Sequence, residues 1–137
     1  MNRTVIVLLK SLPIGEACNI AAILSGQLAQ MHVDMYSTVA VNDKQGFRHA
    51  GIENNIVILK AKSSQQLINF GEELLQNNPK MTPIFFTCAG QKLSNSSNEY
   101  KNTISISQLS ECDPVGVAIH GIDMDVRTIT KRFSLMT

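Results

Sequence analysis

A chain of 137 residues is long enough to bury about two-thirds of its unfolded surface without disulfides or metals, so we expect one domain over residues 1–137. Its 12 basic and 11 acidic side chains give a net charge of +1, which excludes a strong whole-protein attraction to nucleic acid or to an anionic membrane. Hydrophobic residues make up 44% of the chain and charged residues 17%, the composition of an ordinary globular protein.

The cysteines indicate the compartment. Cys18, Cys88 and Cys112 form an odd number without a C-x-x-C spacing. Reduced thiols explain this pattern better than a disulfide framework does, so we expect a cytosolic protein. The first apolar run is interrupted at Lys10, which makes it too short for a signal-peptide core, and no later run approaches the length of a membrane span.

The first expected element is a strand at residues 5–9, because a run of valine, isoleucine and leucine is typical of a strand buried on both faces. Pro13 disfavours helix at the residue before it, and Gly15 permits a tight turn into a helix. Apolar residues then recur at three- and four-residue intervals as far as Met31, which defines one helical face. The mouth of such a turn is a usual place for a site in α/β proteins, so functional residues are sought near 15–19.

A hairpin is predicted near residues 36–52, because residues 42–46 are rich in turn formers and have short strand-like segments on both sides. Residues 56–62 predict a second buried strand. Ser63 or Ser64 is placed to cap a helix that follows, with an apolar face that includes the residues Leu67, Phe70 and Leu74.

The second half of the chain predicts two further core strands and a final helix. The expected segments are a strand at 81–87, a loop at 94–98, a short helix between 100 and 111, and a strand at 115–121. Asp123 or Asp125 is placed to cap the last helix.

Four separated segments carry a recognisable pattern in order along the chain. They are Leu12-Pro13 to Asn19-Ile20-Ala21-Ala22, Asp43 to His49-Ala50-Gly51-Ile52, Ile58-Leu59-Lys60-Ala61, and Ile129 to Leu135. The pattern resembles domain-of-unknown-function family 2000, a group of uncharacterised bacterial proteins with the fold of peptidyl-tRNA hydrolase II. The resemblance implies a three-layer α/β/α sandwich around a four-stranded mixed sheet, with the hairpin at 36–52 as an addition, and a homodimer.

The resemblance does not extend to the chemistry of peptidyl-tRNA hydrolase II. Those enzymes have a Gly-Lys-Gly-Lys type turn before the first helix and an Asp-Ala-Gly-Arg-Thr type motif after the third strand. Here the two segments read Gly15-Glu16-Ala17-Cys18-Asn19 and Cys88-Ala89-Gly90-Gln91-Lys92. The ammonium and the carboxylate that would polarise a water and stabilise an oxyanion are absent from both, so we expect no peptidyl-tRNA hydrolysis.

The expected function is binding of a small polar ligand or a protein partner. The residues expected to form the site are Gly15, Asn19, Asp43, His49, Cys88 and Gly90. Asn19 offers both amide atoms to a ligand near helix amides that favour a carboxylate or phosphate, although capping of the helix explains it equally well. His49 also fits a structural role, fastening the hairpin to the sheet by hydrogen bonds, and Asp43 fits that of a turn former.

The alternative is an enzyme, either a residual hydrolase of peptidyl-tRNA or esters, or a Cys88-based acyl transferase. The transferase requires His120 within hydrogen-bond reach of the Cys88 thiol, whereas a buried cysteine commonly packs as a small hydrophobe. The histidines His32, His49 and His120 share no spacing with acids or cysteines that is typical of a metal site. We therefore expect no metal and no cofactor.

Overall fold

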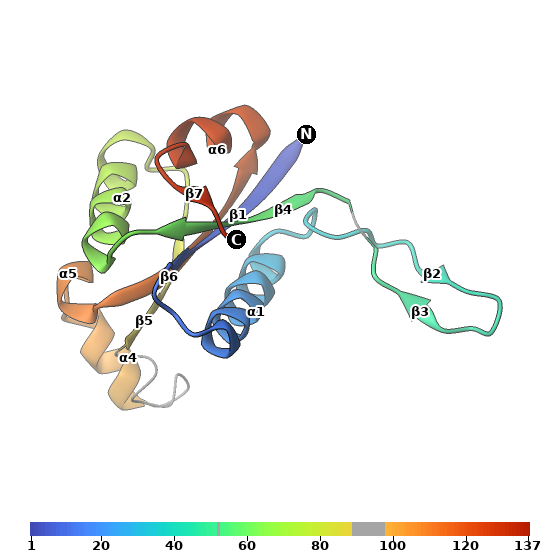
Figure 1. Cartoon of the computed structure of the whole chain (residues 1–137), viewed down its shortest axis with the longest axis horizontal. Helices are drawn as coiled ribbons and strands as arrows, with labels where there is room; N and C mark the ends of the chain where they lie inside the picture. Colours follow the sequence, from blue (N-terminus) through green and yellow to red (C-terminus); the bar gives the residue numbers. More distant parts are fainter. Residues whose placement is uncertain (52, 89–97) are drawn as a thin grey trace.

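The computed structural model of the chain describes residues 1–51, 53–88 and 98–137. It shows a mixed five-stranded sheet, helices on both of its faces and a separate two-stranded hairpin (Figure 1). The sheet has the order β5-β6-β1-β4-β7. Its strands, in that order, are β5 (Ile84–Thr87), β6 (Pro114–Ile122), β1 (Asn2–Leu9), β4 (Asn55–Ala61) and β7 (Ser134–Leu135). β1 runs parallel to β4 and antiparallel to β6, so the first strand of the chain lies at the centre of the sheet.

The sheet has one strand more than the four that the sequence indicated. β7 is only two residues long and pairs with Leu59 and Lys60 of β4. Two residues are too few to produce the alternation by which a strand is recognised in a sequence, so this edge strand was missed.

Five helices accompany the sheet in the described residues. They are α1 (Ile14–Met31), α2 (Ser64–Asn77), α4 (Asn98–Ser105), α5 (Leu109–Cys112) and α6 (Asp123–Thr130). The Ser63 hydroxyl caps α2 by accepting a hydrogen bond from the backbone N–H of Gln66, which confirms that prediction. The cap predicted for α6 is wrong, because its N-cap residue is Ile122 and both aspartates lie inside its first turn. None of the helices in these three described stretches is long and apolar enough to cross a membrane.

The two faces of the sheet pack against different helices. Successive strand residues point to opposite sides, so Val5 and Val7 belong to a core cluster with α2 and α6, while Ile6 and Leu8 belong to a second cluster with α1. All four side chains are almost completely buried. The apolar run at the start of the sequence therefore is, as predicted, a strand covered on both faces.

The hairpin forms an arm, residues 37–51, that projects away from the sheet (Figure 1). Its strands β2 (Val41–Asn42) and β3 (Arg48–His49) lie inside the segment where the sequence predicted a hairpin. The turn closes because the backbone N–H of Gly46 donates to the Asp43 carbonyl at 3.1 Å, and Gly46 has a φ of 97°, a conformation that favours glycine. Every residue from 38 to 50 is exposed.

Candidate functional site

The structure places two of the sequence-predicted site residues on the arm, away from the others (Figure 1). Gly15 and Asn19 are exposed near the start of α1, and Cys88 is partly buried beyond the end of β5. Asp43 and His49 contact each other on the arm. The two arm residues are therefore not joined to those of α1 and β5 in the part of the chain that the structure describes (Figure 1), and Gly90 lies outside that part.

A pocket of about 420 Å³ lies beside the start of α1. Its apolar lining includes Leu8, Leu12, Ile14, Ala17, Ala21 and Ile58, and Lys10 supplies a positive charge. Asn19 does not cap the helix, because it lies further along α1 and the N-cap residue is Pro13. The pocket thus suits an apolar group that carries an acid better than it suits a small polar ligand.

Asp43 organises the turn of the arm. Its Oδ1 accepts hydrogen bonds from the backbone N–H groups of Gln45 at 2.9 Å and Phe47 at 3.0 Å, and its Oδ2 lies 2.8 Å from His49 Nε2. The pKa of Asp43 is held below its usual 3.8, mainly by the hydrogen bond with His49 and to a smaller extent by those with the turn amides. Asp43 is thus a turn former, as one interpretation of the sequence expected, whereas His49 is hydrogen-bonded within the hairpin rather than to the sheet.

We expect the order of this turn to be lost at strongly acidic pH. A carboxyl group with a folded-state pKa below its usual 3.8 contributes stability above that pH, and the contribution is lost as the pH falls through the lowered folded value. An acid titration of the Phe47 amide followed by NMR measures the transition. In Asp43→Asn the amide signal should already be altered at neutral pH and should not titrate. A wild-type Phe47 amide that stays unchanged through the titration would contradict the expectation.

Cys88 and His120 lie at opposite ends of β6. The backbone N–H of Cys88 donates to the carbonyl oxygen of Asp113 at 3.0 Å, just before β6 begins, whereas His120 comes seven positions later. At about 3.3 Å a residue, the two are separated by roughly 23 Å. The structure therefore does not form the Cys88–His120 pair that an acyl transferase would need. Cys88 packs against the core cluster of α1, as a small hydrophobe would.

His120 instead belongs to a polar cluster at the other end of β6. Thr4 and His120 are direct cross-strand partners in β1 and β6, with Thr4 Oγ1 2.8 Å from His120 Nδ1. His120 Nε2 lies 3.0 Å from Asp34 Oδ2. Because α1 packs on this face and ends at Met31, its C-cap residue His32 also arrives here, and the centroids of the two imidazole rings are 4.7 Å apart.

The cluster also fastens the arm. The Asn2 side-chain amide donates to Asp34 Oδ2, and Asn54 Nδ2 donates to the backbone carbonyl of Asp34 at 2.9 Å. Asp34 precedes the arm and Asn54 follows it. The two roots of the arm are therefore joined to each other and to the N-terminal end of β1 through one residue.

Burial differs sharply within the cluster. The side chain of His120 is 3% exposed and that of Asp34 is 47% exposed. Burial is the main cause that lowers the pKa of His32 below its usual 6.5. The nearby His120 lowers this pKa further, whereas Asp34 raises it. The pKa of Asp34 is lowered below its usual 3.8, mainly by the hydrogen bond from His120 and to a smaller extent by the one from Asn2. At neutral pH the cluster thus contains a neutral His32 imidazole beside an ionised carboxylate.

The hydrogen-bond chain from Thr4 through His120 to Asp34 has the order of nucleophile, base and acid in a hydrolase triad. The exposure of the residues does not suit a triad, however. Thr4, in the position of the nucleophile, is only 1% exposed, so no substrate can reach its hydroxyl. What the cluster does offer is one ligand atom from each of His32, Asp34 and His120, all within 4.8 Å of one another. Such a set is chemically able to hold a metal ion.

This cluster was not predicted from the sequence, although all three histidines are visible there. His120 follows Asp34 by 86 residues, so no local spacing connects the two. The available signal was His120 itself, a polar side chain at the end of an apolar strand, together with the pair His32 and Asp34 just after the end of an amphipathic helix.

Comparison with known proteins identifies the family. The family DUF2000, described as a protein of unknown function, matches residues 2–137. The solved structure of the protein of unknown function Atu0240 from Agrobacterium tumefaciens strain C58 has a similar fold, with a TM-score of 0.84 at 15% sequence identity over 99% of this chain and 98% of that one. No curated protein matches the sequence. Because the family match extends over nearly the whole length, the chain belongs to the DUF2000 family.

Proposed function

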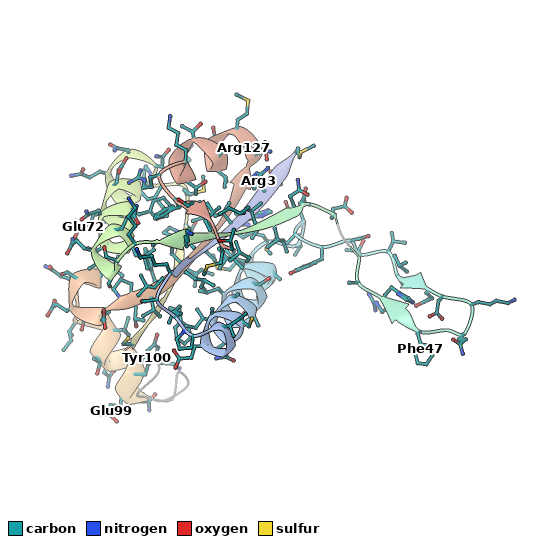
Figure 2. The ribbon with its side chains drawn as sticks, in the orientation of Figure 1. Arg3, Phe47, Glu72, Glu99, Tyr100 and Arg127 are labelled. Carbon is teal, nitrogen blue, oxygen red and sulfur yellow. The ribbon has the colours of Figure 1, made fainter. Side chains whose placement is uncertain are left out.

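We propose that this DUF2000 protein is a binding protein without hydrolase chemistry, and that it assembles with a second copy of itself through the arm. The observation that carries the proposal is the exposure of every residue from 38 to 50. Three large apolar side chains lie in that segment, with Val39 70%, Val41 48% and Phe47 66% exposed. Figure 2 shows Phe47 on the arm, remote from the sheet and its helices.

An isolated two-stranded hairpin is only marginally stable in water, because it lacks an apolar surface on which to pack. Val41 lies opposite His49, and the backbone N–H of Asp43 donates to the Phe47 carbonyl, so alternation puts Phe47 on the same side of the ribbon as this pair. The arm therefore presents Val41 and Phe47 on one face. Burying that face against another molecule removes it from water and stabilises the hairpin.

The features of the chain favour a second copy as the partner. A net charge of +1 leaves no long-range repulsion between copies. The pocket at the start of α1 combines an apolar lining with the Lys10 ammonium, and the arm combines Phe47 with the Asp43 carboxylate on the same face. In a two-fold dimer each arm would occupy the pocket of the other copy, so that this contact is made twice.

We infer further that the sheet and helices have the arrangement of peptidyl-tRNA hydrolase II, and that the protein acts in the cytosol. The order of the sequence segments that resemble this fold supports the first inference, and the odd number of cysteines supports the second. The positions of the catalytic lysine and aspartate of that family correspond to Asn19 and Cys88. The separation of Cys88 from His120 supports an absence of acyl-transfer chemistry.

The oligomeric state tests the proposal. Wild-type protein is expected to have twice the monomer mass of 15.0 kDa by light scattering after gel filtration. Phe47→Asp, which places a charge on the apolar face of the arm, and Ile14→Asp, at a pocket residue that is 84% exposed, should each give monomers. A mixture of these two variants should recover part of the dimer, because one intact arm and one intact pocket remain in each mixed pair.

Ile106→Asp is the matched control, since Ile106 is 87% exposed but lies outside both the arm and the pocket. It should remain a dimer. A monomeric wild type, or a Phe47→Asp variant that stays dimeric, would overturn the pairing. Peptide release from peptidyl-tRNA or turnover of activated esters that Cys88→Ala abolishes would overturn the absence of hydrolase chemistry.

A further inference from the structure

We propose that His32, Asp34 and His120 bind one divalent transition-metal ion of the zinc type. The three residues come from the end of α1, the segment after it and β6, and meet beside the N-terminal end of β1. None of the three residues is part of the arm or of the pocket at the start of α1.

The ligand atoms already lie close to the spacing that a metal requires. Donors at about 2.0–2.1 Å from a tetrahedral zinc ion lie roughly 3.3 Å from one another. His120 Nε2 and Asp34 Oδ2 are 3.0 Å apart, and all three ligand atoms lie within 4.8 Å. His32 is only partly buried, so a small rotation of its side chain can close the remaining gap.

The donor types select the ion. Two imidazole nitrogens and one carboxylate suit zinc and its neighbours in the first transition series, whereas magnesium and calcium prefer oxygen ligands throughout. Three protein ligands leave a coordination position for water. Asp34, with a side chain that is 47% exposed, lies on the side from which the ion and that water enter.

Thr4 can orient His120 both before and after an ion binds, because a hydroxyl group is a donor and an acceptor. While Asp34 accepts the proton of His120 Nε2, the Thr4 hydroxyl donates to Nδ1. When Nε2 binds the ion, the imidazole proton is on Nδ1 and is donated to Thr4 Oγ1 across the same 2.8 Å. Metal-bound histidines usually have such a partner on the second nitrogen, and losing it weakens metal binding about 10–100-fold.

Calorimetric titration of zinc alone into the metal-free full chain tests the proposal. We expect one ion per chain. His32→Ala and Asp34→Asn remove a ligand at solvent-accessible positions, so these variants should fold normally and lose more than about 100-fold in affinity. Thr4→Val should lose about 10–100-fold, and Thr4→Ser, which keeps the hydroxyl, should recover most of it.

Two controls separate this site from other sources of zinc binding. His49→Gln removes the histidine of the arm, which also pairs with an aspartate, and should bind zinc as the wild type does. Cobalt in place of zinc should give d–d bands in the visible and no thiolate-to-cobalt charge-transfer band in the near ultraviolet, which excludes the cysteines as ligands. The titration is repeated on Phe47→Asp, so that oligomeric state and zinc affinity are measured separately.

Three results would overturn the metal site. They are the absence of one-to-one binding in the wild type, an affinity that His32→Ala and Asp34→Asn leave unchanged, and a loss in His49→Gln as large as in those two variants.

Discussion

Replacing Phe70 with alanine is expected to lower the free energy of unfolding by about 3–5 kcal/mol. Phe70 lies on α2 and is 0% exposed, in the core cluster that joins α2 and α6 to the sheet. Its ring meets that of Phe133 edge to face, with the centroids 5.2 Å apart, and the Arg132 guanidinium lies 5.3 Å from the Phe70 centroid. The substitution thus removes apolar burial, an aromatic pair and a cation–π contact, and it leaves a cavity.

Urea unfolding followed by circular dichroism measures this loss. Leu75→Ala is the matched control on the same helix, because Leu75 is 78% exposed and its replacement should change the stability by no more than about 0.5 kcal/mol. Similar midpoints for the two variants would mean that α2 does not pack on the sheet as described.

The second large effect is expected at Leu28, where alanine should cost about 2–5 kcal/mol. Leu28 is 0% exposed and belongs to the other core cluster, between α1 and the sheet. Its backbone carbonyl accepts the N–H of His32 at 2.8 Å, so it lies in the turn of α1 that positions the polar cluster. Loss of the leucine side chain leaves a cavity under that turn.

The neighbouring Gln27 is exposed, so Gln27→Ala gives a matched control with an expected change within about 0.5 kcal/mol. Differential scanning calorimetry of the two variants provides the comparison. A Leu28→Ala variant that melts at the temperature of Gln27→Ala would show that this end of α1 contributes little to the core.

Much of the fold could be predicted because its core elements have strong periodic patterns. The run at Val5 and the spacing of Leu67 and Phe70 each specify one element, and local chemistry at Ser63 specifies where α2 begins. Weak local signals produced the errors. β7 has only two residues, so it has no recognisable pattern. Asp123 was expected to cap α6, but it accepts a hydrogen bond from Arg3 Nε at 2.6 Å, and the neighbouring sequence does not reveal this distant partner.

The candidate site could not be predicted to the same extent, because it depends on contacts between distant segments. His120 meets Thr4 only through the antiparallel pairing of β1 with β6, and it meets Asp34 only because α1 ends on that face. The residues chosen from the sequence lay near turns, where α/β proteins often bind ligands. That rule led to Asn19 on α1 and Cys88 after β5, neither of which belongs to the polar cluster.

The central position of β1 has a consequence for the synthesis of the protein. Val5 pairs with Val57 on one side and with Ile119 on the other, so its second neighbour lies more than a hundred positions further along the chain. A ribosome adds about 5–20 residues per second, which leaves the nascent strand with an open apolar edge for roughly 5–25 s. Unpaired edges of this kind invite aggregation, so newly made chains should depend on chaperones until β6 has been translated.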